Sequence, residues 1–280
     1  MDPQVEDALH DDTFDTELKL ILEAIYLRFH YDFRHYSPAS LKRRLSQAMQ
    51  RFGCRSLSGL QERILHEPGV FPELLSFLTI IVSEMFRDPA FYLALREKVV
   101  PFLQTYPSLK IWVAGCSTGE EVYSLAILLK EEELLDRSLI YATDINPEAL
   151  RKAKAGIYDL DRIAGFSEAY QAAGGRTSLS DYYTAAYGSA VFDKALRKNI
   201  LFSDHSLATD NVFAEVQLVT CRNVLIYFDR ALQDRAIGLF RDSLSRKGFL
   251  ALGAKETLRF SDHAAEFSEF AGAERIYQKE

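Results

Sequence analysis

The most informative segment for the fold of this chain is KIWVAGCSTGEEVYSLAILL, Lys110–Leu129. The pattern predicts a short apolar strand up to Ala114, a glycine-rich turn, and a helix from Glu120. Two interpretations compete for the turn. Its G-x-S-x-G pattern, Gly115–Gly119, is that of a hydrolase nucleophile elbow with Ser117 as the nucleophile. A glycine turn that leads into a helix N-terminus is also typical of the floor of a nucleotide-type cofactor site.

Composition narrows the class of protein. The 280 residues are 48% hydrophobic, which is ample for a buried core, and the net charge of -7 argues against a nucleic-acid binder. No apolar run is long enough to span a membrane, and the acidic N-terminus does not resemble a signal peptide. We therefore expect a cytoplasmic protein without membrane insertion. The three cysteines lack ligand spacing, so neither a disulfide framework nor a metal site is expected.

Periodicity divides the chain into two parts. Residues 1–86 show apolar positions at helical spacing and predict an all-α N-terminal domain. Residues 87–280 alternate short apolar strands with helices, which predicts a Rossmann-like, doubly wound α/β domain with a mostly parallel sheet. This alternation breaks over residues 159–199, which are rich in Gly, Ser, Tyr and Ala. We expect that segment to form a small inserted β-subdomain.

The residues around the turn favour a cofactor over a nucleophile. His205 or His263 could formally complete a hydrolase triad, but the acids Glu120 and Glu121 would oppose an oxyanion at the same helix N-terminus. Asp144 ends the next predicted strand, where a carboxylate can accept hydrogen bonds from ribose hydroxyls. The wide glycine spacing and the acids disfavour a pyrophosphate and suit a ligand with an ammonium or sulfonium group. S-adenosylmethionine carries both groups, so the pattern favours a methyltransferase.

A basic window interrupts the acidic background. Six basic residues and no acid lie between Phe33 and Gln61. Four of them fall on or just beyond one amphipathic helix: Lys42, Arg44, Arg51 and Arg55. The window is either a solvated helix face or a surface that docks an acidic partner.

Five motifs carry a family resemblance. They are SEMFRDP (83–89), AGCSTGEEVYS (114–124), ATDIN (142–146), GIY (156–158) and CRNVLIYFD (221–229). With them, nearly the whole chain resembles the CheR-type chemotaxis methyltransferases. Those enzymes methylate glutamate side chains of chemoreceptors with S-adenosylmethionine and release S-adenosylhomocysteine.

The resemblance implies roles for individual residues. Glu120 would bind the amino group of the cofactor, Asp144 its ribose, and Arg87 would lie near its amino-acid end. The implied cofactor-binding set is Ser83, Arg87, Gly115, Glu120, Asp144, Ser206, Leu207, Arg222 and Asn223. Tyr227 would stand close to the transferable methyl group, and the implied catalytic set is Arg87, Tyr227 and Arg222. The chain departs from the family pattern at Ile81–Ser83 and at Gly253–Glu256.

The expected chemistry needs no general base. A glutamate carboxylate has a reference pKa of roughly 4.3 and is already ionised at neutral pH. Proximity, alignment and desolvation then supply the catalysis, with Arg87 or Arg222 holding the substrate carboxylate. The expected partner is the cytoplasmic helical region of chemoreceptors or receptor-like signalling proteins. The alternatives are an adaptor that senses S-adenosylmethionine without turnover and a serine hydrolase that uses Ser117.

Overall fold

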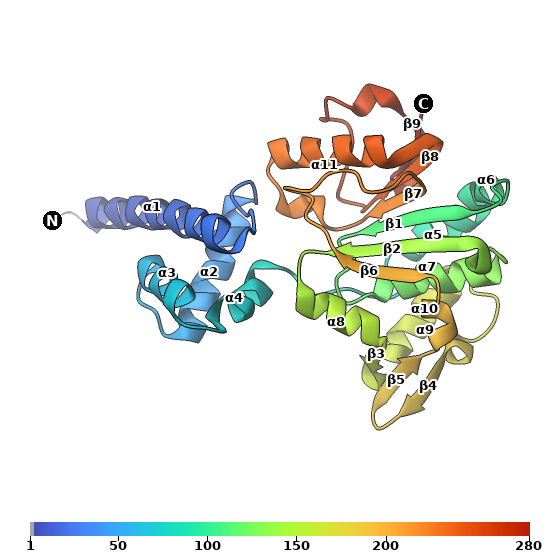
Figure 1. The fold of residues 1–280 in the computed structure, drawn as a ribbon, viewed down its shortest axis with the longest axis horizontal. Helices are drawn as coiled ribbons and strands as arrows, with labels where there is room; N and C mark the ends of the chain where they lie inside the picture. The colour runs from blue at the N-terminus through green and yellow to red at the C-terminus, as the bar shows by residue number, and fades with distance from the viewer. Residues whose placement is uncertain (1–2) are drawn as a thin grey trace. The chain divides into compact units, whose positions relative to one another are not determined.

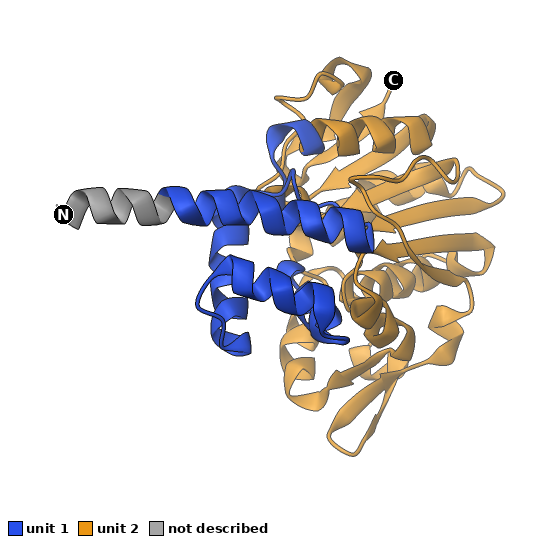
Figure 2. Cartoon of the chain, turned by 60° about the vertical axis from the view of Figure 1, so that its left-hand side comes forward, with its two compact units in different colours: residues 1–80, 227–232 blue, residues 81–226, 233–280 orange. Residues whose placement is uncertain are grey.

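The computed structural model describes residues 3–280, with side chains from residue 12 onward. Figure 2 shows the chain divided into two compact units, residues 1–80 with 227–232 and residues 81–226 with 233–280. The change between the units falls after residue 80, whereas sequence analysis placed the domain boundary after residue 86. The smaller unit also takes in the short segment 227–232, which no sequence pattern indicated.

The smaller unit is helical, as predicted. It contains α1 (Pro3–Phe29), α2 (Pro38–Phe52), α3 (Leu57–His66) and α4 (Val70–Leu78). Helix α2 starts at a proline, where a missing N–H costs nothing, and is followed by Gly53 with a φ of 66°. The apolar residues at helical spacing are buried and form the core of this unit, among them Ile21, Ile25, Leu41, Leu45, Leu60 and Leu74.

The segment 227–232 is joined to the helical unit through its backbone. The Ser37 amide donates to the Tyr227 carbonyl at 2.7 Å, and the Asp229 amide donates to the His35 carbonyl at 2.8 Å. Between these bonds, Tyr36 and Phe228 form an antiparallel bridge. Tyr227 therefore belongs structurally with residues 35–37, although it is far from them in sequence.

The larger unit is built on a seven-stranded mixed sheet (Figure 1) in the order β6-β2-β1-β7-β8-β10-β9. The five strands β6, β2, β1, β7 and β8 are parallel, and β10 pairs antiparallel with β8 and with β9. The strands are β1 (Leu109–Ala114), β2 (Ser138–Asp144), β6 (Ile200–Asp204), β7 (Val216–Cys221), β8 (Leu244–Leu252), β9 (Phe267–Ala271) and β10 (Ile276–Lys279).

Helices cover both faces of this sheet, which confirms the doubly wound α/β class (Figure 1). The α-helices of the larger unit are α5 (Pro89–Ala94), α6 (Val100–Leu103), α7 (Glu120–Glu131), α8 (Pro147–Ala155), α9 (Ile163–Ala172), α10 (Lys194–Arg197) and α11 (Arg230–Ser243). Helix α7 is packed inside the unit: its residues from Val122 to Leu129 are all buried, and all of them except Ser124 are hydrophobic. None of the helices in the described part of the chain is long and apolar enough to cross a membrane.

The insertion forms a separate three-stranded antiparallel sheet, as predicted, in the order β3-β5-β4. Its strands are β3 (Ile157–Asp159), β4 (Tyr183–Ala186) and β5 (Ser189–Phe192), with α9 between β3 and β4. The aromatic residues Tyr158 and Phe192 hold it to the larger unit through the ring of Tyr123 on α7, with ring centroids 5.9 and 5.5 Å away. Tyr158, Tyr170 and Tyr182 are buried and pack the subdomain, whereas Tyr187 is fully exposed.

The topology determines where a ligand can bind. Strand β1 has β2 on one side and β7 on the other, so the chain order reverses at β1. In open α/β sheets, ligands bind beyond the carboxyl ends of the strands at such a point. The glycine turn follows β1 at this edge, Asp144 ends β2, and Arg222 follows β7.

Candidate functional site

The glycine turn owes its shape to close packing. Gly115 and Gly119 have φ values of 73° and 93°, which L side chains rarely adopt. A Cβ on Gly115 would lie 2.4 Å from the side chain of Val224, and one on Gly119 would lie 2.9 Å from that of Ala153. A side chain at Gly115 would thus have no room, and the role of Gly115 as a cofactor contact stays a prediction. Its missing side chain admits Val224, from the loop after β7.

Asp144 links the turn to the end of β2. Its carboxylate accepts hydrogen bonds from the Ser117 amide at 2.8 Å and from the Asn146 amide at 2.9 Å, one on each oxygen. Burial raises the pKa of Asp144, and the backbone hydrogen bonds oppose that rise. An ionised carboxylate has about four acceptor sites. With the amides of Ser117, Asn146 and Ile145 as donors, Asp144 still keeps acceptor capacity for a ribose hydroxyl, which fits the role that the resemblance implied.

Glu120 lies fully buried at the first position of α7, where a partner satisfies each of its carboxylate oxygens. Oε2 accepts from the Thr118 hydroxyl at 2.6 Å, and Oε1 forms an ion pair with Arg162 Nη1 at 2.8 Å. The Arg162 side chain is 38% exposed, so it connects the buried acid to solvent. The sequence analysis missed Arg162. The available signal was its place four residues after the motif GIY, in the segment that returns to the glycine turn.

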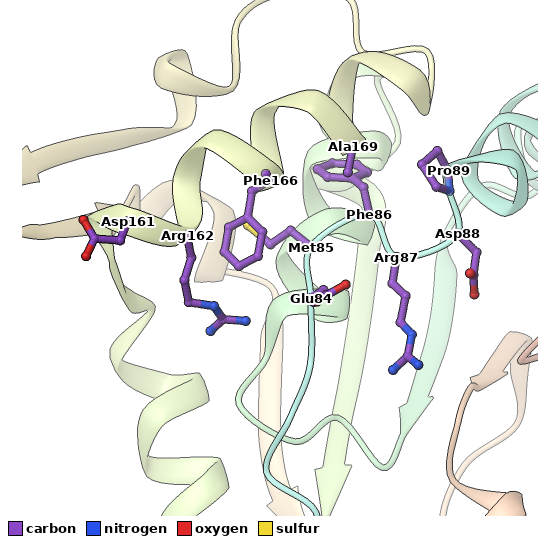
Figure 3. Close-up of a pocket in the computed structure, with 11 residues that line it drawn as sticks. Glu84, Met85, Phe86, Arg87, Asp88, Pro89, Asp161, Arg162, Phe166 and Ala169 are labelled. Atoms are coloured by element: carbon purple, nitrogen blue, oxygen red, sulfur yellow. The ribbon is translucent and has the colours of Figure 1, made fainter.

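A cavity of about 380 Å³ opens beside Arg162, while Glu120 is not among its lining residues (Figure 3). Arg87 and Arg162 line it from different segments, and their guanidinium groups extend toward the same side in Figure 3. Arg87 is exposed, and its side chain has no hydrogen-bond or ion-pair partner among the described residues. Ser83 directly precedes Glu84, the first residue in the sequence that lines the cavity. Its carbonyl accepts a hydrogen bond from Arg162. The lining residues are Glu84, Met85, Phe86, Arg87, Asp88, Pro89, Asp161, Arg162, Gly165, Phe166 and Ala169.

Arg222 has a different environment from the one expected. Its side chain is 1% exposed and forms ion pairs with Asp88 at 2.8 Å and Glu121 at 3.3 Å. It also donates to the Arg87 carbonyl at 2.9 Å and lies 4.1 Å from the centroid of the Phe91 ring. A guanidinium so enclosed and paired ties α5 and α7 to the end of β7. The expectation that Arg222 holds a substrate carboxylate is therefore not supported by this geometry.

The loop after β7 is fixed by an acid whose role the sequence analysis missed. The buried carboxylate of Glu256 accepts from the amides of Asn223 and Val224, both at 2.9 Å, and from the Gly253 amide at 2.6 Å. Burial raises the pKa of Glu256, while these hydrogen bonds oppose the rise. Asn223 has a φ of 62°, so its backbone is held in an unfavourable region by these bonds. Glu256 thus positions the predicted contact Asn223.

Ser206 and Leu207 follow β6 at the same edge of the sheet. The Ser206 amide donates to Asp210 at 2.9 Å, and Leu207 is buried. The preceding His205 lies among aromatic rings, with its ring centroid 5.2 Å from that of Trp112. These residues form an ordered loop at the position where the resemblance placed the adenine.

The structure gives no support to the hydrolase interpretation. The Ser117 hydroxyl is buried and has no hydrogen-bond partner among residues 12–280. The ring of His205 instead faces the Asn211 carbonyl, 3.2 Å from Nε2, and the ring of His263 faces Glu266, 3.3 Å from Nδ1. A serine without a base within hydrogen-bond reach is not an activated nucleophile.

The predicted docking residues lie in the helical unit and differ in exposure. Arg44 is 5% exposed, donates to the Leu78 carbonyl, and sits 4.8 Å from the centroid of the Tyr227 ring. The prediction that Arg44 belongs to a docking surface is wrong, because its side chain turns inward to pack on Tyr227. Lys42 pairs with Asp15 at 2.5 Å, Arg51 pairs with Glu73 at 3.0 Å, and Arg55 is exposed.

Comparison with known proteins agrees with this architecture. Residues 82–274 match the family model "CheR methyltransferase, SAM binding domain", and residues 16–79 match "CheR methyltransferase, all-alpha domain". The putative methyltransferase Cher3 of Pseudomonas putida is 58% identical over 95% of this chain and 97% of its own length. A chemotaxis protein methyltransferase of Listeria monocytogenes is 30% identical over 81% of this chain and 84% of its own.

A second Pseudomonas relative extends this match. The chemotaxis protein methyltransferase 1 of Pseudomonas aeruginosa is 31% identical over 79% of this chain and 82% of its own length. Both parts of the chain are therefore matched, and S-adenosylmethionine is the cofactor that the matched domain binds. The chain belongs to the CheR family of S-adenosylmethionine-dependent methyltransferases, as the sequence motifs predicted.

Proposed function

We propose that this chain transfers a methyl group from S-adenosylmethionine to glutamate side chains of a chemoreceptor or receptor-like signalling protein. The observation that carries the proposal is Arg87, an exposed guanidinium that has no side-chain partner among the described residues and that lines a cavity together with Arg162. A guanidinium binds a carboxylate through paired donors. The Arg87 side chain is thus free to hold the carboxylate that is to be methylated.

The residues at the carboxyl edge of the sheet fit the cofactor. Asp144 keeps acceptor capacity for the ribose hydroxyls, and Glu120 supplies the negative charge for the ammonium group. The loop of Asn223 and the loop of Ser206 close the remaining sides in this proposal. When bound, S-adenosylmethionine supplies a methyl group on a positively charged sulfonium.

The chain's own contribution is to position the reacting groups. In this proposal Arg87 orients the substrate carboxylate at the cavity that it lines. No side chain needs to remove a proton, because a glutamate with a pKa of roughly 4.3 is ionised at neutral pH. Tyr227, proposed near the methyl group from the resemblance alone, packs against Arg44 within the helical unit.

The direct test is methyl transfer to receptor fragments with labelled cofactor. We expect base-labile methyl esters, and we expect Arg87→Gln to lower turnover on receptor about a hundredfold while cofactor affinity falls much less. Arg151→Gln is the matched control, because Arg151 is 69% exposed and pairs only with a neighbour on α8. Cofactor binding without any methyl ester would favour the sensing adaptor instead.

The basic residues of the helical unit give a second, weaker test. Arg51 is 63% exposed and Arg55 is exposed as well, whereas Arg44 is buried. We expect Arg51→Glu with Arg55→Glu to raise KM for a receptor severalfold at low salt and to leave cofactor binding unchanged. The measurement is receptor methylation as a function of ionic strength. An unchanged KM at low salt would remove the docking role from this helix.

A further inference from the structure

The two guanidinium groups of the cavity are not equivalent. Arg87 has no side-chain partner in the described part of the chain, while Arg162 is paired with the buried Glu120. The amino-acid end of S-adenosylmethionine carries both an ammonium and a carboxylate. Glu120 accounts for the ammonium alone. A cation near Glu120 would pair with the cofactor's carboxylate, and Arg162 is the cation that lies against Glu120.

Arg162 has the geometry for that second contact. Its Nη1 lies 2.8 Å from Glu120 Oε1, its Nη2 donates to the Ser83 carbonyl, and its guanidinium lies 4.8 Å from the centroid of the Phe166 ring. A guanidinium has five N–H donors in a fixed plane. The partners found in the described residues use two of its nitrogens, so donors remain on a side chain that is 38% exposed and lines the cavity.

The inserted subdomain holds Arg162 in place from its own side. The Tyr158 hydroxyl on β3 donates to the Thr118 carbonyl at 2.8 Å, so the insertion is hydrogen-bonded to the glycine turn itself. Thr118 in turn donates its hydroxyl to Glu120. The segment that carries Arg162 is thus held next to Glu120 by a second contact, which is independent of the ion pair.

We infer that Arg162 binds the carboxylate of the cofactor, next to the ammonium that Glu120 binds. The inference rests on the proposed contact between Glu120 and the ammonium. The four charges would then alternate: Glu120 negative, ammonium positive, carboxylate negative, Arg162 positive. This arrangement makes the inserted subdomain part of the cofactor site and leaves Arg87 free for the substrate.

Titration calorimetry on the full chain measures the binding of three ligands, without turnover. It separates the contact to the ammonium group from the contact to the carboxylate. S-adenosylhomocysteine has both charged groups, its decarboxylated analogue keeps only the ammonium, and methylthioadenosine has neither. We expect Arg162→Gln to weaken S-adenosylhomocysteine about ten- to hundredfold and the decarboxylated analogue less than about threefold. Arg162→Lys should recover part of the loss, because it keeps the charge without the paired donors.

The matched control is Arg176→Gln. Arg176 also reaches from the insertion to an acid of the α7 region, Glu132, at 2.7 Å, but it does not line the cavity. It should leave all three affinities unchanged. Thermal unfolding of every variant shows whether the fold is intact.

Two results would overturn the inference. One is full affinity of Arg162→Gln for S-adenosylhomocysteine. The other is an equal loss for S-adenosylhomocysteine and the decarboxylated analogue, which would mean that Arg162 only holds Glu120 in position. The underlying contact is tested separately by Glu120→Gln, which should weaken both charged ligands and spare methylthioadenosine. If it does not, the proposed ammonium contact fails, whatever Arg162 does.

Discussion

Two adjacent glutamates at the start of α7 have different surroundings. Glu120 pairs with Arg162, whose side chain is 38% exposed at the cavity. Glu121 pairs with Arg222, whose side chain is 1% exposed, and also accepts from the Thr220 hydroxyl at 2.7 Å. The two pairs have the same chemistry. They differ in whether a ligand can reach the arginine.

Helix geometry explains the difference. Consecutive residues of a helix point about 100° apart, so one glutamate faces the insertion while the next faces β7. The pair at the cavity can rearrange when a zwitterionic ligand arrives, because one partner is solvated. The enclosed pair of Glu121 and Arg222 is not accessible to a ligand, so it stabilises the packing of the unit. In the proposed function, this single dipeptide contributes Glu120 to the ligand site and Glu121 to the framework beneath it.

The largest effect is expected from breaking the enclosed pair. Arg222→Gln removes one member of a buried ion pair and leaves Glu121 without its counter-charge, which typically costs about 3–5 kcal/mol. We expect the free energy of unfolding to fall by that amount in urea denaturation. The surface variant Arg151→Gln removes an exposed ion pair and should change it by less than about 1 kcal/mol. Equal losses in the two variants would contradict the distinction drawn between the pairs.

The next test exchanges the two glutamates. Glu120→Gln should weaken S-adenosylhomocysteine about ten- to hundredfold, because a charge-assisted contact to the ammonium is lost. Glu121→Gln should act mainly on stability, since its partner Arg222 is buried. Calorimetry gives the cofactor affinity of each variant, and urea denaturation gives its free energy of unfolding. A larger affinity loss for Glu121→Gln would reverse the assignment.

A smaller effect is expected on cofactor affinity as a function of pH, through Asp144. Burial raises the pKa of Asp144 above the ordinary value of 3.8. Protonation removes acceptor capacity, so cofactor affinity should decline as pH falls through this raised pKa. The contribution of Asp144 to the free energy of unfolding has the opposite pH dependence. It is fully present below pH 3.8 and is lost as pH rises through the raised pKa of the folded state. Calorimetry against pH should show the affinity decline in the wild type and a flatter profile in Asp144→Asn.

The sequence predicted the parts of the site that follow strands in a regular order. Glu120 and Asp144 could be proposed from the sequence because a turn after one strand and an acid at the tip of the next are local features. Arg162 and Glu256 were missed because their contacts join residues 42 and more than 30 positions apart. Arg44 was misplaced for a related reason: helical spacing gives the face of a helix, and its packing against Tyr227 depends on a return of the chain that no periodicity reveals.

Ser117 gives the smallest expected effect, and it bears on the interpretation of the glycine turn. Its amide donates to Asp144, and alanine keeps that amide. Its hydroxyl is buried without a partner among the described residues, so removing it gives up no hydrogen bond. Alanine and serine are similarly disfavoured at the φ of 48° found here. Ser117→Ala should therefore change stability by less than about 0.5 kcal/mol and leave cofactor affinity intact. Turnover of an activated ester that disappears in this variant would instead show that the hydroxyl is a nucleophile.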